Sequence, residues 1–85
     1  MTSIDAEQGA ALTARLYECR RTLKFLHGES YAATVQGWKD LLLETVTPGE
    51  SLVSHTVACA QRSHDVAVTL WLLAALVEIL EAKES

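Results

Sequence analysis

The C-terminal third of the sequence carries a hydrophobic surface that is too wide for one neighbouring helix to cover. If residues 66–81 form a helix, with successive side chains ~100° apart, their apolar residues fall on two adjacent ridges. The first ridge contains Val66, Leu70, Leu73, Val77 and Leu80. The second ridge contains Val68, Leu72, Leu76 and Ile79, and only the strip of Ala67, Ala74, Glu78 and Glu81 is expected to face solvent. Such a helix must be covered on two sides.

The rest of the chain offers little to cover it, because the whole sequence has 85 residues. A protein of this size buries only about 60–65% of the surface that its unfolded chain exposes, so its core is small. The hydrophobic fraction of 49%, with 4 Gly and 1 Pro, is typical of a compact helical protein and argues against a disordered one. We expect one helical domain over residues 1–85.

Gly and Pro residues divide the chain at two places, His27-Gly28 and Thr47-Pro48-Gly49. Before each division, apolar residues recur at steps of three and four, which is the spacing of a helix with one buried face. The first stripe contains Leu12, Leu16, Cys19, Leu23 and Leu26. The second contains Tyr31, Val35, Trp38 and Leu42, with Leu41 and Leu43 beside it. These stripes predict helices at about residues 5–27 and 31–46.

Capping residues support the ends of these two helices. Asp5 followed by Gln8 resembles a capping box at the start of the first helix. Gly28 suits the left-handed position after its last residue. Ser30 is a favourable N-cap for the second helix.

The third helix is predicted to begin at residue 48. Thr47 and Glu50 form a T-x-x-E capping box, and Pro48 occupies the one helical position that tolerates proline. From Glu50 onward there is no Gly or Pro, so the chain forms either one long bent helix or two helices separated near Ser63-His64-Asp65. Because Ser and Asp favour helix caps, we prefer the break.

These boundaries predict an all-α fold, a small antiparallel bundle of three to four helices at about 5–27, 31–46, 48–62 and 65–82. The second ridge of the last helix has no evident cover within the chain. We therefore expect a homodimer whose interface contains Val68, Trp71, Leu72, Leu76 and Ile79, with Arg20, Arg21 and Lys24 as a charged rim. The alternative is a monomeric bundle in which the last helix is central and Trp71 covers it.

No motif for catalysis accompanies this surface. Ser63-His64-Asp65 has the residue types of a hydrolytic triad, but consecutive helical side chains point ~100° apart, so we expect a capping or turn role. The sequence thus predicts a small non-catalytic helical protein–protein interaction module without a cofactor. It would be a homodimeric regulator or inhibitor that binds a partner protein through an apolar helix face.

His55 and Cys59 support an alternative function, a metal- or cofactor-binding helical bundle. They are four residues apart and share a helical face, which is a suitable spacing for two metal ligands. Cys19 or His27 would have to complete the coordination sphere. The simpler interpretation is that Cys59 is a small core residue and His55 a polar residue at the edge of the core.

Charge and the N-terminal sequence bear on partners and location. The net charge is −4. The first predicted helix is basic near its end, but the second and third helices offer only Lys39 and Arg62, so nucleic acid is not an expected partner. The N-terminus lacks the basic and apolar regions of a secretory signal, and no apolar run has the length of a membrane span. Cys19 and Cys59 do not form the spacing of a disulfide framework. We expect a cytoplasmic protein.

Overall fold

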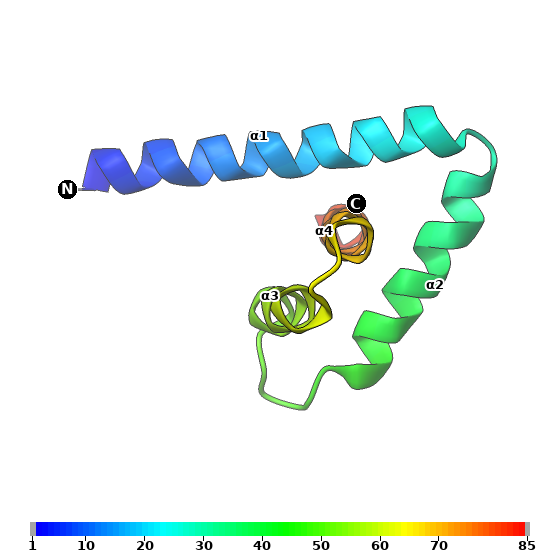
Figure 1. The fold of residues 1–85 in the computed structure, drawn as a ribbon. Helices are drawn as coiled ribbons and strands as arrows, with labels where there is room; N and C mark the ends of the chain where they lie inside the picture. The colour runs from blue at the N-terminus through cyan, green and yellow to red at the C-terminus, as the bar shows by residue number, and fades with distance from the viewer. Residues whose placement is uncertain (1, 85) are drawn as a thin grey trace.

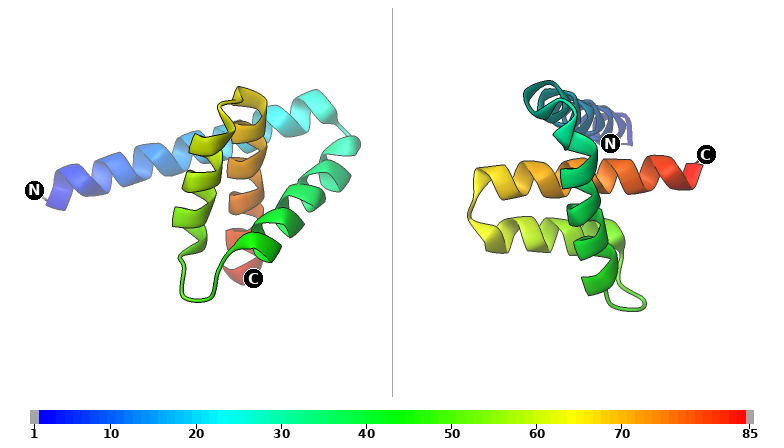
Figure 2. Two further views of the ribbon diagram at one scale, coloured as in Figure 1. Left: turned by 60° about the horizontal axis from the view of Figure 1, so that its bottom comes forward. Right: turned by 90° about the vertical axis from the view of Figure 1, so that its right-hand side faces the viewer.

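The computed structural model describes residues 2–84 of the chain, with side chains described from residue 13 to residue 83. It contains four helices, which are α1 (Thr2–His27), α2 (Ser30–Thr45), α3 (Leu52–Ser63) and α4 (Val66–Glu84). Helices α3 and α4 run antiparallel, and α1 and α2 lie across this pair (Figures 1 and 2). The predicted all-α bundle is confirmed.

Helix α4 is the centre of the bundle. It packs against each of the other three helices, whereas those three make few contacts with one another. Ala74 and Ala75 are fully buried, and their small side chains let neighbouring helices approach α4 closely. The alternative arrangement, in which the last helix is central, is therefore the one found. No helix within residues 2–84 combines the length and apolarity needed to cross a membrane.

The two predicted apolar stripes differ in how well the structure confirms them. In α2, Tyr31, Val35 and Leu42 are buried as predicted, while Leu41 and Leu43 beside them are exposed. The stripe of α1 is buried at Leu23 and half-buried at Leu16 and Cys19. Leu26 is 67% exposed, because α4 crosses α1 steeply and covers only part of its length (Figure 1). Leu12 lies outside the described side chains.

The link between α1 and α2 is built on one glycine. Gly28 has φ +53°, the left-handed conformation that was predicted for it. The N-cap of α2 is Glu29, whereas Ser30 is already helical and its hydroxyl donates to the carbonyl of the preceding helix. The predicted N-cap at Ser30 is thus wrong by one residue. Helix α1 begins at Thr2, so Asp5 lies within the helix and is not its cap.

The segment before α3 is a turn and not the first turn of a helix. The backbone N–H of Glu50 donates to the carbonyl of Thr47 at 3.0 Å, and Gly49 has φ +86°. Pro48 and Gly49 thus occupy the two central positions of a type II turn, the positions where these residue types are preferred. The predicted start at residue 48 is therefore wrong, and α3 begins four residues later.

The ends of α3 and α4 explain the break between them. The hydroxyl of Ser51 accepts from the N–H of Ser54, which caps the start of α3. At the end of α3, His64 adopts a left-handed conformation with φ 53°. The carboxylate of Asp65 accepts the N–H of Val68 at 3.1 Å and caps the start of α4. The predicted break is confirmed.

Candidate functional site

The predicted interface on α4 lies in the chain's own core. Trp71, Leu72, Leu76 and Ile79 are buried, and Val68 is half-buried against them. The first ridge, which was expected to face this chain, is the more exposed one, and Val66 at its start is 77% exposed. The expectation that the second ridge is left uncovered is therefore wrong. The reason is that α1, α2 and α3 surround α4 on more than two sides.

Trp71 contributes to the core through two aromatic neighbours. Its ring centroid lies 4.9 Å from that of His27 and 5.7 Å from that of Tyr31. The Tyr31 hydroxyl donates to Glu78 at 2.7 Å. Burial raises the pKa of the Tyr31 phenol, and the Glu78 carboxylate raises it further. The strip of α4 that was expected to face solvent is thus partly covered, because Ala74 is fully buried and Glu78 is bound by Tyr31 of α2, while Ala67 is exposed.

The three residues of the predicted charged rim have different roles. Arg20 forms ion pairs with Glu78 and Glu81 and therefore ties α1 to α4. The ammonium group of Lys24 lies 5.5 Å from the centroid of the Tyr31 ring, a cation–π distance. Arg21 is exposed and, among the described residues, makes no ion pair. Arg21 and Lys24 are therefore both exposed to solvent, whereas Arg20 is held against α4.

The outer face of α1 is the set of exposed residues Ala14, Glu18, Arg21 and Phe25. Their spacing of four, three and four places them on one side of the helix, opposite the buried Leu23. Phe25 is 86% exposed, the highest value among the large hydrophobic residues whose side chains the structure describes. The other three helices all lie on one side of α1 (Figure 1). Sequence reasoning missed this face because Phe25 falls outside the apolar stripe.

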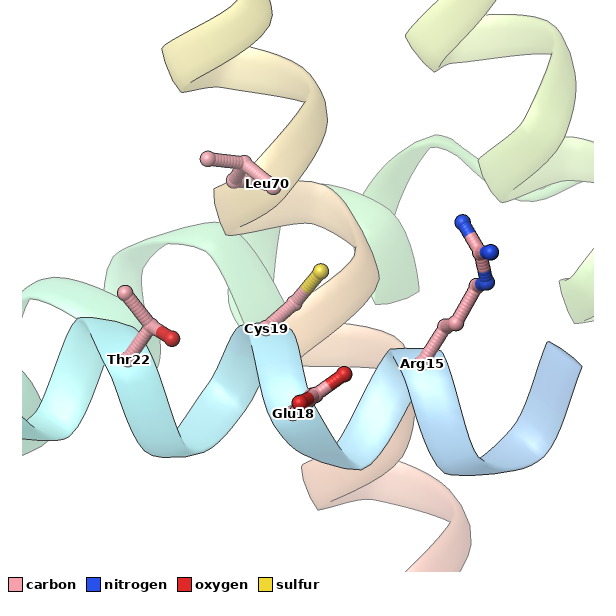
Figure 3. Close-up of a pocket in the computed structure, with 5 residues that line it drawn as sticks. All are labelled: Arg15, Glu18, Cys19, Thr22 and Leu70. Carbon is pink, nitrogen blue, oxygen red and sulfur yellow. The ribbon is translucent and has the colours of Figure 1, made fainter. Parts of the chain in front are cut away.

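A first cleft, of about 290 Å³, lies between α1 and α4 (Figure 3). It is lined by Arg15, Glu18, Cys19 and Thr22 from α1 and by Leu70 from α4. Cys19 is a free cysteine that is half-buried here. No described group forms a hydrogen bond with its sulfur. The cleft thus contains a thiol without an adjacent base.

A second cleft, of about 400 Å³, lies between the end of α2 and α3 and is open to solvent. It is lined by Leu41, Thr45, Thr47, Glu50, His55, Cys59 and Arg62. We call four of these residues the thiol cluster: Glu50, His55, Cys59 and Arg62. It contains both residues that the sequence singled out as possible metal ligands.

The thiol cluster places a carboxylate, an imidazole and a thiol in series. His55 Nδ1 lies 3.3 Å from Glu50 Oε1, and His55 Nε2 lies 3.6 Å from Cys59 Sγ. Arg62 Nη2 donates to the same sulfur at 3.6 Å. His55 is 6% exposed, so it is buried and not at the edge of the core. The ring is therefore fixed between its neighbours.

Glu50 is held by the turn that precedes α3. Its Oε1 accepts the backbone N–H of Thr47 at 3.2 Å and the Thr47 hydroxyl at 3.1 Å. The backbone hydrogen bond, and then the hydroxyl, hold the pKa of Glu50 below its usual value. Glu50 therefore presents a carboxylate to His55 at neutral pH. Sequence reasoning paired Thr47 with Glu50 but gave them a helix-capping role.

His55 and Cys59 come together, but they lack a third metal ligand. Glu50 faces Nδ1 while Cys59 lies at Nε2, so the three side chains cannot bind one ion. Cys19 and His27 belong to α1, which does not pack against α3 in the described part of the chain. Within the described part of the chain, no group of three or more His, Cys, Asp or Glu side chains is positioned to hold a metal.

Ser63 and Asp65 have local structural roles. The Ser63 hydroxyl donates to the carbonyl of Ala60 at 2.8 Å, and the N–H of Asp65 donates to that hydroxyl. Because Asp65 caps α4, the capping role predicted for this tripeptide is confirmed.

Comparisons with protein-family models, with curated proteins and with solved structures gave no match.

Proposed function

We propose that the protein is a non-catalytic helical interaction module that forms a homodimer through the outer face of α1. The observation that carries this proposal is the 86% exposure of Phe25. Burying a side chain of this size is worth ~2 kcal/mol, and aromatic residues are enriched in protein interfaces. The contact surface is thus on α1 and not on the ridge of α4.

A second copy of the chain fits this face in both size and charge. Consider two α1 helices paired antiparallel about a twofold axis, with Glu18 of one copy beside Arg21 of the other. The same register places Ala14 of one copy beside Phe25 of the other. The small alanine leaves room for the ring, and each contact occurs twice, as an isologous interface requires. The spacing of the four residues therefore makes the face complementary to itself.

The face is free to pair, but it is narrow. The other three helices lie on one side of α1 (Figures 1 and 2), and of the four residues of the face Glu18 alone borders the cleft between α1 and α4. Two Phe25 side chains supply ~4 kcal/mol gross, which is similar to the lower estimates for the cost of association. Flanking contacts, such as those of Leu26, would add the remainder. We expect a weak dimer whose population depends on concentration.

Two further features support a non-catalytic regulator or inhibitor located in the cytosol. Both clefts are open to solvent, whereas catalytic sites gain from excluding water. Cys19 and Cys59 are both free thiols, which suits a reducing compartment.

Charge reversal provides the sharpest test of the dimer. Glu18→Arg places two arginines opposite each other at both symmetry-related contacts, and Arg21→Glu does the same with two glutamates. We expect each variant alone to sediment as a monomer at concentrations where the unmodified chain dimerises. An equimolar mixture should form a heterodimer, because opposite charges then face each other again.

Glu44→Arg makes the same charge change on the exposed surface of α2 and serves as the matched control. It should dimerise like the unmodified chain. If the two α1 variants also dimerise unchanged, or if their mixture stays monomeric, the proposed interface is wrong.

A further inference from the structure

The two cysteines of the chain sit in different chemical surroundings. Each is half-buried and lines an open cleft. The sulfur of Cys59 faces two nitrogens, His55 Nε2 and Arg62 Nη2, each at 3.6 Å. Arg15 lines the cleft of Cys19 without a hydrogen bond to its sulfur. Cys59 therefore has a base and a cation beside it, and Cys19 provides an internal comparison.

The carboxylate of Glu50 orients the imidazole for this thiol. When Nδ1–H donates to Glu50, the neutral ring presents a lone pair at Nε2, on the side of Cys59. That is the tautomer needed to accept a thiol proton. The Thr47–Glu50 turn fixes the carboxylate through two hydrogen bonds. Proton transfer from the thiol thus depends on three groups. Glu50 positions the ring, His55 is the base and Cys59 is the nucleophile.

Thr45 satisfies Nε2 whether or not the ring has taken up a proton. Its hydroxyl lies 2.7 Å from His55 Nε2 and 2.7 Å from the carbonyl oxygen of Leu41. With neutral His55, the hydroxyl either donates to Nε2 or keeps its hydrogen on the Leu41 carbonyl, and in the second orientation the Nε2 lone pair is open to the thiol proton of Cys59. With protonated His55, Nε2–H donates to the hydroxyl, whose own hydrogen turns to Leu41. A small rotation of one hydroxyl therefore accommodates the proton transfer without leaving a buried group unpaired.

We propose that Cys59 is an activated thiol that exchanges with small anionic disulfides and carries a mixed disulfide in the cleft between α2 and α3. The sulfur of Cys59 attacks one sulfur of the disulfide, so one S–S bond forms as the other breaks. The thiol proton passes to His55 Nε2 and then to the departing thiolate. One disulfide is consumed and one is formed, so the step needs no other oxidant. This inference does not depend on the proposed dimer.

Arg62 selects the class of disulfide. Its guanidinium lies on the wall of the cleft beside the sulfur, and the side chain is exposed. A guanidinium binds carboxylates through paired hydrogen bonds, so a disulfide that carries a carboxylate is held next to Cys59. Leu41 provides an apolar wall for the rest of the molecule. The open cleft lets the attached group extend into solvent.

The first experiment compares the two thiols directly. Cys19→Ser leaves only Cys59, and Cys59→Ser leaves only Cys19. With dithiobisnitrobenzoate, a disulfide that carries two carboxylates, we expect Cys59 to react about tenfold faster than Cys19. In guanidinium chloride the two rates should become similar, because the cluster is then lost. Equal rates in the folded proteins would overturn the proposal.

The second experiment tests the positioning role of Glu50, since the buried His55 is a poor site for substitution. In the Cys19→Ser background, Glu50→Gln should slow the reaction several-fold, whereas Glu50→Asp should restore part of the rate. Circular dichroism melting curves identify variants that remain folded. If the folded Glu50→Gln variant reacts as fast as the Cys19→Ser protein, the proposed proton transfer from Cys59 to a His55 ring oriented by Glu50 is wrong.

The third experiment tests recognition of the anion. Arg62→Gln should slow reaction with dithiobisnitrobenzoate by a larger factor than reaction with the uncharged dipyridyl disulfide, and Arg62→Lys should recover part of the difference. Mass spectrometry after incubation with glutathione disulfide should find the adduct on Cys59 and not on Cys19. An equal loss of rate with both probes would overturn the proposed selectivity for anions.

Discussion

Helices α4 and α1 show two ways in which a helix of a small bundle relates to its neighbours. Helix α4 is apolar around most of its circumference and is covered by the three other helices. The other three helices lie on one side of α1, and its outer face carries Phe25, the most exposed large hydrophobic residue among the described side chains. The helix with the most apolar sequence is therefore not the one that carries the most exposed large hydrophobic side chain among those described.

The difference shows what hydrophobic periodicity measures. The amount of apolar surface on a helix indicates how many neighbours it needs, and α4 finds them within its own chain. Which apolar side chains remain uncovered is shown by their exposure in the folded chain and not by their periodicity, as at Phe25.

The test with the largest expected effect removes one side chain from α4 and, in a separate variant, one from α1. Leu72→Ala leaves a cavity beside fully packed neighbours, so it should lower the free energy of unfolding by about 3 kcal/mol. Phe25→Ala should change the stability of the monomer by less than about 0.5 kcal/mol, while weakening the dimer. Urea denaturation at low protein concentration measures both. If the two variants lost the same free energy of unfolding, α4 would not be the centre of the core.

A smaller effect is expected at Tyr31, which joins α2 to α4. Tyr31→Phe removes the hydrogen bond to Glu78 and should reduce stability by about 1 kcal/mol. Because the folded-state pKa of Tyr31 is raised above its ordinary value of 10.0, the unfolded chain loses the phenolic proton first. Stability should therefore fall as pH rises above about 10. Denaturation curves of both proteins at alkaline pH measure this loss, which should be smaller in Tyr31→Phe.

The smallest effect is expected at Glu50, whose carboxylate is near the surface. Its folded-state pKa is lowered, chiefly by the Thr47 backbone N–H, so it contributes stability above its ordinary value of 4.5. That contribution should disappear as pH falls through the lowered folded-state pKa. In acid denaturation, the Glu50→Gln variant should not show this loss of stability. An unchanged acid profile would mean that the turn does not depend on the carboxylate.

Features set by local chemistry could be predicted from the sequence. Gly28 ends α1 in a left-handed conformation, Asp65 caps α4, and Tyr31, Val35 and Leu42 form the buried stripe of α2. Each depends on residues that are close in sequence. Local prediction failed at the caps assigned to Asp5 and Ser30, and at Pro48, where a capping-box pattern and a type II turn pattern overlap and the turn forms.

Features set by tertiary geometry could not be predicted. The spacing of Val68 and Leu72 shows that they share a ridge, but the neighbours that cover it depend on how α1 and α2 cross α4. The shared face of His55 and Cys59 was predicted from their spacing. The approach of Glu50 to the same ring was not, because it depends on where the preceding turn places the carboxylate.

The central position of α4 also has a consequence for biosynthesis. Translation produces α1, α2 and α3 before the helix against which all three pack. Until α4 leaves the ribosome, the apolar residues of the nascent chain lack the surface that shelters them, so folding must follow the emergence of residues 66–84. A ribosome stalled near residue 65 would therefore hold a chain that chaperones and proteases recognise.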